Sequence, residues 1–148
     1  MKALILILLI STFLQTTIWP LEFALIIILI RAAIKPGPEN LYLSFGFGVL
    51  LAHLLLLPLG SLSLLYLVLV MSISLILKRW HSEHPLILIL LVLSGLLIND
   101  LAFSVIIKSW NVSFAKLAVE AFLILPIYIM VKFLEERFIV KSEIKLKF

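Results

Sequence analysis

The chain contains no cysteine, which excludes a disulfide framework, a thiolate metal site and a cysteine nucleophile. Charged residues are scarce, at 14% of the 148 positions, whereas a soluble domain carries about a quarter. The sequence also lacks a glycine-rich phosphate loop, a cofactor motif and a metal-ligand set with suitable spacing. Its lysines and arginines form no compact basic patch, which sets nucleic-acid binding aside. These absences favour a non-enzymatic protein that holds no cofactor or metal.

Apolar residues make up 64% of the chain and its mean hydropathy is +1.30, so much of this surface must face lipid. Crossing the hydrocarbon core takes about 20 apolar residues. We therefore expect an all-α polytopic membrane protein with six transmembrane helices. The expected spans are residues 3–19, 21–34, 41–57, 61–77, 85–107 and 114–134. Residues 1–134 would form the membrane domain, and residues 135–148 a basic cytoplasmic tail.

The second span is short and contains Glu22 and Arg31. We expect Arg31 and Lys35 to reach the lipid headgroups by snorkelling. Charge placement supports keeping this span, because six spans put ten of the 12 lysines and arginines on the side of the termini. Only Lys108 and Lys116 fall on the other side. Since cytoplasmic loops hold the excess of positive charge, both termini are expected in the cytoplasm.

The tail ends in a stretch, residues 143–148, that alternates polar and apolar side chains. This alternation is compatible with a strand or with a segment lying on anionic lipid. A frayed, solvated terminus is the other interpretation.

A stripe of small residues occurs in the third span, where Ser44, Gly48 and Ala52 recur every four positions and share one helix face. Such a face lets a neighbouring helix approach closely in lipid, so it is a candidate surface for docking a partner. His53 adjoins this face, and residues 58–61 form a tight turn into the fourth span.

Several polar side chains are expected at similar depths in the outer half of the membrane, from a helix rise of about 1.5 Å per residue. Lys116 and Glu120 are four residues apart and can pair along one helix face. Matching depth also suggests a pairing of His53 with Asp100. The layer forms either a polar pocket or docking surface, or hydrogen bonds between helices. Its members are Gln15, Glu22, His53, Asn99, Asp100, Lys116 and Glu120.

Two stretches of the first half resemble motifs of the MreD family of bacterial rod-shape-determining membrane proteins. Residues 13–20, Phe-Leu-Gln-Thr-Thr-Ile-Trp-Pro, resemble the end of that family's first helix. Residues 46–53, followed by Pro58-Leu59-Gly60 and Tyr66, resemble its third and fourth helices. The chain departs from the family pattern at His53, where relatives carry an acid, and at residues 20–22, where relatives have Pro-Asp-Leu.

The resemblance implies a non-enzymatic scaffold of cell-wall elongation in the bacterial cytoplasmic membrane. It implies an MreC-like bitopic partner and an assembly with MreB, RodA and a penicillin-binding protein. The MreD family resembles the substrate-binding subunits of energy-coupling-factor vitamin transporters in fold, so such a subunit is the alternative function. The first span lacks the Ala-x-x-x-Ala face that those subunits use for docking. A small membrane enzyme is a third, weaker alternative.

Overall fold

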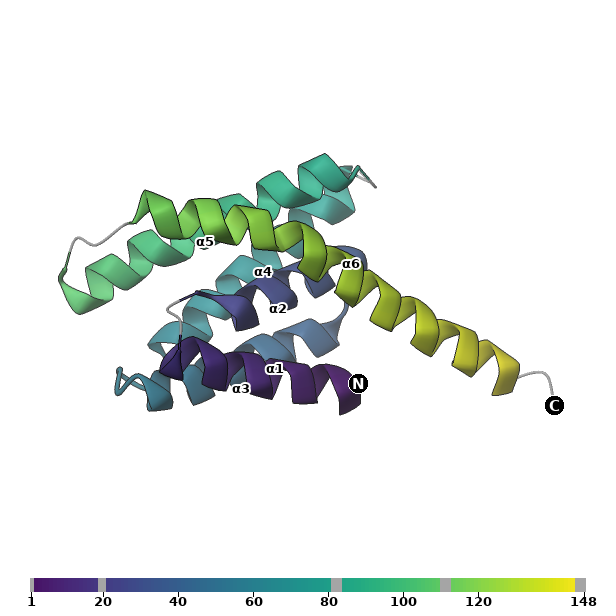
Figure 1. Cartoon of the computed structure of the whole chain (residues 1–148), viewed down its shortest axis with the longest axis horizontal. Helices are drawn as coiled ribbons and strands as arrows, with labels where there is room; N and C mark the ends of the chain where they lie inside the picture. The colour runs from purple at the N-terminus through teal and green to yellow at the C-terminus, as the bar shows by residue number, and fades with distance from the viewer. Residues whose placement is uncertain (1, 19–20, 81–83, 110–112, 146–148) are drawn as a thin grey trace.

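A computed structural model describes residues 2–18, 21–80, 84–109 and 113–145, and these residues form six α-helices (Figure 1). The all-α prediction is therefore confirmed. The helices are α1 (Lys2–Thr17), α2 (Phe23–Ile34), α3 (Pro38–Leu54), α4 (Ser61–Trp80), α5 (Pro85–Ile107) and α6 (Phe114–Lys145).

Successive helices run in alternating directions, as Figure 1 shows. The last turns of α1, α3 and α5 lie at the same end of the bundle as the first turns of α2, α4 and α6. We call this the hairpin end. The N-terminus, the α2–α3 connection and the far end of α6 lie at the opposite end, which we call the terminal end.

Helix α2 is the centre of the bundle and contacts all five other helices. Its residues from Ala24 to Ala32 are all buried. A helix that is apolar over most of its circumference is stable where protein or lipid covers that surface. With 12 residues, α2 is about 18 Å long, less than the hydrocarbon thickness of about 30 Å. Its neighbours cover it, which explains how so short a segment fits in an otherwise longer bundle.

Three of the surrounding helices are long and apolar enough to cross a membrane, judged by length and composition. They are α4, α5 and α6, with candidate spans Ser61–Arg79, Pro85–Ile107 and Phe114–Arg137. Large apolar side chains such as Leu64, Leu90 and Phe122 point outward from these helices. These helices and their exposed apolar side chains indicate a membrane protein, because soluble proteins rarely expose so much contiguous apolar surface.

The small-residue face of α3 packs against α4 of the same chain. Ser44 and Ala52 are fully buried, and a Cβ atom added to Gly48 would lie 2.5 Å from Ser63 Cα. The predicted close approach is therefore confirmed, but its use for docking a partner is wrong, because α4 already covers the face. Helix α3 ends at Leu54, earlier than expected, and Gly60 with φ of +100° completes the turn into α4.

Helix α6 continues through the predicted tail as far as Lys145, so the tail begins as a continuation of the last helix, while the candidate span Phe114–Arg137 ends close to the expected residue 134. The strand interpretation is also wrong for residues 143–145, and residues 146–148 lie outside the described residues. Beyond the bundle this helix projects freely (Figure 1). In the part of α6 that leaves the bundle, the Arg137 guanidinium lies over the Phe133 ring, 4.6 Å from the ring centroid.

Candidate functional site

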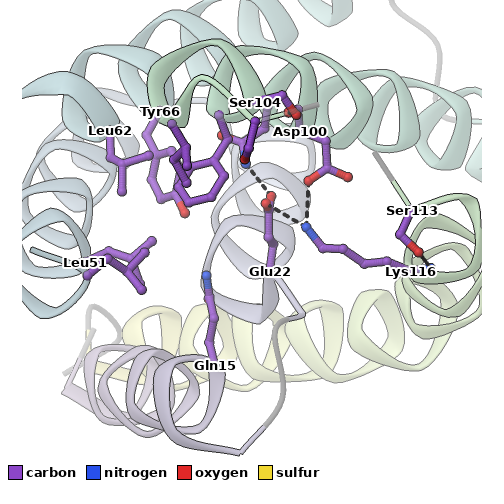
Figure 2. A pocket seen from close by; sticks show the side chains of 14 residues that line it. Gln15, Glu22, Leu51, Leu62, Tyr66, Asp100, Ser104, Ser113 and Lys116 are labelled. Atoms are coloured by element: carbon purple, nitrogen blue, oxygen red, sulfur yellow. Dashed lines mark hydrogen bonds and ion pairs between the residues drawn. The ribbon is translucent and has the colours of Figure 1, made fainter. Parts of the chain in front are cut away.

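A cluster of ionisable and amide side chains lies inside the hairpin end, and Figure 2 labels four of its members, Gln15, Glu22, Asp100 and Lys116. It joins four helices, because its members come from α1, from the residue that precedes α2, and from α5 and α6. We call this group the hairpin-end cluster. Its members are Gln15, Glu22, Asn99, Asp100, Lys116 and Glu120, six of the residues that the sequence predicted to share one layer.

Lys116 is the cation at the centre of this cluster. Its Nζ lies 2.6 Å from Asp100 Oδ1 and 3.0 Å from Glu22 Oε1, and both are hydrogen bonds (Figure 2). The same atom lies 3.7 Å from Glu120 Oε1, which confirms the pairing predicted along α6. Lys116 therefore connects α6 with α5 and with the start of α2.

The start of α2 obtains further hydrogen bonds from its neighbours. The first backbone N–H groups of a helix have no partner within the helix itself. The backbone N–H of Glu22 donates to Glu120 Oε1 at 3.0 Å, and that of Ala24 donates to Gln15 Oε1 at 3.4 Å. The Asn99 amide donates to Glu22 Oε2. Side chains of α1, α5 and α6 thus hold the buried end of the central helix.

The acceptors of this cluster outnumber its donors. Three carboxyl groups, on Glu22, Asp100 and Glu120, surround the single ammonium of Lys116. Within the part of the chain that the structure describes, three buried oxygens have no hydrogen-bond partner. They are Asn99 Oδ1, Asp100 Oδ2 and Glu120 Oε2. Such unmatched acceptors are costly in a buried place, where each normally has a donor.

A cavity of about 430 Å³ adjoins the cluster (Figure 2). One side of it is polar, with Gln15, Glu22, Asn99, Asp100 and Lys116 in its wall. The rest of the lining is mostly apolar, and Ser109 and Ser113, which flank the α5–α6 connection, also belong to it. The apolar and aromatic lining residues are Leu51, Leu55, Leu62, Tyr66, Phe103 and Ile107.

Nine lining residues were not among the predicted site residues, and two of these are buried polar residues, Tyr66 and Ser104. Tyr66 is buried in α4, and its hydroxyl group within an apolar span is a signal that could have identified it. Ser104 follows Asp100 by one helical turn and donates to the Asp100 carbonyl oxygen at 2.8 Å. A helical spacing of four from a buried acid would have identified it.

His53 lies outside the cluster, so its predicted membership of the layer is wrong. Its side chain is exposed near the end of α3, while Asp100 binds Lys116. The expected pairing of His53 with Asp100 is therefore also wrong. The small residues Ser44, Gly48 and Ala52 do not line the cavity either, since they face α4. Equal depth along two helices does not make two residues face each other.

A second buried ionic group lies at the terminal end, around Arg31 of α2. The side chain is only 2% exposed, so the predicted snorkelling is wrong for Arg31. Arg31 Nε donates to Glu135 of α6 and Nη2 donates to Glu39 of α3, each at 2.8 Å. Nη1 donates to Asn40 Oδ1 at 2.7 Å. The planar guanidinium has several fixed donors and can hold three partners at once.

Glu39 is the exposed partner in this group, at the first turn of α3. The hydrogen bond from Arg31 lowers the pKa of the Glu39 carboxyl below its usual 4.5. Lys35 approaches Glu135 at 3.6 Å but its side chain is half exposed, so it adds less. Both ends of α2 are therefore fastened through charged groups to other helices.

Among the described residues, no group of three or more His, Cys, Asp or Glu is placed to hold a metal ion. In the hairpin-end cluster the Lys116 ammonium occupies the position between the carboxylates. Comparison with protein-family models, with curated proteins and with solved structures finds no match to this chain.

Proposed function

We propose that this chain is a multi-pass membrane scaffold of the MreD type, which binds an MreC-like partner during cell-wall elongation. In this proposal all six helices cross the bacterial cytoplasmic membrane, with both termini in the cytoplasm. The assembly would include MreB, RodA and a penicillin-binding protein. Two observations carry the proposal. They are the motif resemblance within residues 13–66 and the alternating directions of successive helices.

The positions of the charges support this orientation. Of the 11 lysines and arginines that the structure describes, nine lie toward the terminal end, and only Lys108 and Lys116 lie toward the hairpin end. Positive charge accumulates on the cytoplasmic side of membrane proteins. The shortness of α2 is no obstacle, because its neighbours shield it from lipid.

The interior contacts support a role in assembly. The buried ionic groups at the two ends of α2 hold separate helices together, which suits a rigid platform. The partner's single helix would lie on an outward apolar surface, since α4 covers the small-residue face of α3. Exposed positions on three helices offer such surfaces, among them Phe13, Val68 and Phe122.

The test is photocrosslinking in membranes that contain this chain and the MreC-like protein of the same organism. A photoreactive amino acid replaces Phe13, Val68 or Phe122, which are 55%, 59% and 81% exposed. Matched controls carry it at Ile26 or Ile124, which are fully buried. We expect a crosslink and co-purification from at least one exposed face and none from the controls. Absence of co-purification and of all crosslinks would refute the scaffold proposal.

The cavity favours one second candidate, a substrate-binding subunit of an energy-coupling-factor type vitamin transporter. A volume of about 430 Å³ falls in the range of small-molecule sites, about 300 to 1,000 Å³. Such a subunit works with a membrane-embedded coupling protein and two ATPases. Recovery of those ATPases with the purified chain, in place of an MreC-like protein, would favour this alternative.

A further inference from the structure

Two residues that line the hairpin-end cavity each carry a buried acceptor atom without a hydrogen-bond partner among the described residues. Asn99 is 2% exposed and Asp100 is 7% exposed, and both line the cavity. Asn99 Oδ1 and Asp100 Oδ2 have no hydrogen-bond partner among the described residues. Each lies on a side chain whose other polar atom is engaged, so the side chain is held in place. Fixed, buried acceptors of this kind call for a donor from outside the chain.

The charge around these atoms specifies the kind of donor. Three carboxyl groups accompany one lysine, so the cluster lacks positive charge when its acids are ionised. An anion would be repelled, and a neutral molecule without N–H or O–H groups would leave the acceptors unmet. A metal ion would have to displace Lys116, whose Nζ already bridges Glu22 and Asp100. An organic ammonium group supplies both the missing charge and the missing donors.

The opposite wall of the cavity accommodates an apolar body. Leu51, Leu62 and the ring of the buried Tyr66 face the space (Figure 2), and Phe103 of α5 also belongs to the lining. Aromatic faces attract organic cations, and this attraction grows when water is excluded. The volume of about 430 Å³ is ample for a ring or a short alkyl chain beside the ammonium.

We propose that the hairpin-end cavity binds a small primary amine with a short apolar body. Its ammonium lies beside the Asn99 and Asp100 side chains, and its body lies against the apolar lining residues. The ligand enters from the hairpin end, where Ser109 and Ser113 belong to the lining. This inference goes beyond the scaffold function and does not depend on the partner protein.

The experiment measures calorimetric binding of 2-phenylethylamine, butylamine and putrescine to the purified full chain in detergent. The neutral control is 2-phenylethanol, which has the same ring without the ammonium. We expect saturable binding of at least one amine, about tenfold or more tighter than the alcohol, since a charge-assisted hydrogen bond is the stronger kind. Absence of saturable binding by all three amines at millimolar concentration would overturn the proposal, as would equal binding of the alcohol.

Two variants locate the site. Asp100→Asn removes the negative charge with little change of shape, and we expect amine binding to weaken about tenfold or more. Leu62→Trp fills the cavity and leaves the charged cluster intact, and we expect it to abolish binding. Glu39→Gln, at the terminal end, is the matched control and should bind as wild type does. Unchanged binding in both cavity variants would place the amine elsewhere and overturn the proposal.

The outcome is separable from that of the scaffold proposal. Amine binding is measured on the isolated chain, whereas the scaffold test measures crosslinking to a second protein. A chain that crosslinks to its partner but binds no amine refutes only the cavity inference. A chain that binds amine without co-purifying any MreC-like protein refutes only the scaffold.

Discussion

Replacing Gly48 by alanine tests the closest helix contact in the bundle. The added Cβ would lie 2.5 Å from Ser63 Cα and 2.8 Å from Ser63 N. Carbon atoms prefer separations of about 3.5 to 4 Å, so α3 and α4 would have to move apart by about 1 Å. Overpacking of this kind costs about 1 to 3 kcal/mol. The higher helix propensity of alanine offsets only about 0.5 to 1 kcal/mol of this overpacking cost.

Gly46 provides the matched control, since it lies on the same helix and a Cβ there meets nothing within 4 Å. The measurement is unfolding of each purified variant in detergent, by heat or by titration with a denaturing detergent. We expect Gly48→Ala to be less stable than Gly46→Ala, and Gly46→Ala to match or exceed wild type. Ser63→Gly should not rescue Gly48→Ala, because two of the nearest atoms are backbone atoms. Equal stability of the two alanine variants would refute the close-packing argument.

The remaining predictions concern the charged groups. Arg31→Met should lower the unfolding free energy by about 3 to 5 kcal/mol, because it leaves buried partners unpaired. Lys35→Met, which removes an exposed charge, should cost under about 1 kcal/mol in the same assay. Lys116→Met should cost about 3 kcal/mol or more, since three carboxyls lose their cation, and the exposed Lys108→Met should be nearly neutral. Arg31 lowers the pKa of Glu39 in the folded chain below its usual 4.5. The contribution of this ion pair to folding stability is therefore present above pH 4.5 and is lost as the pH falls through the lower pKa of the folded chain. The unfolding temperature of wild type should therefore drop more steeply than that of Glu39→Gln between about pH 5 and pH 3.

The sequence predicted the helices well because their signals are local. Runs of apolar residues and flanking proline or glycine mark where each helix begins or ends, and Pro85–Ile107 agrees with the expected span at both ends. The end of α6 was not predictable in this way. Its residues after 134 are polar enough to leave the membrane, yet they still favour a helix. Hydropathy reports where lipid contact ends, and a helix can continue in water beyond that point.

The hairpin-end cluster was predictable in depth but not in orientation. Rise along the helix placed Glu22, Asp100 and Lys116 at one level, and they do meet. The same argument placed His53 beside Asp100 and failed, because depth says nothing about which way a helix face turns. The predicted snorkelling of Arg31 was wrong for a related reason. Its partners lie on α3 and α6, and Glu135 is more than a hundred residues away in the sequence.

The buried charges of α2 also impose an order on biogenesis. At its first end the central helix depends on Lys116 and Glu120, and at its last end Arg31 depends on Glu135. All three of these partners lie on α6, the last of the six helices to be synthesised. Until α6 has been translated, nascent α2 holds charges that its earlier neighbours only partly match, and unmatched charge in lipid is costly. The packing of the bundle is therefore completed late. Its most buried helix, α2, gains its last partners only after α6 has been synthesised.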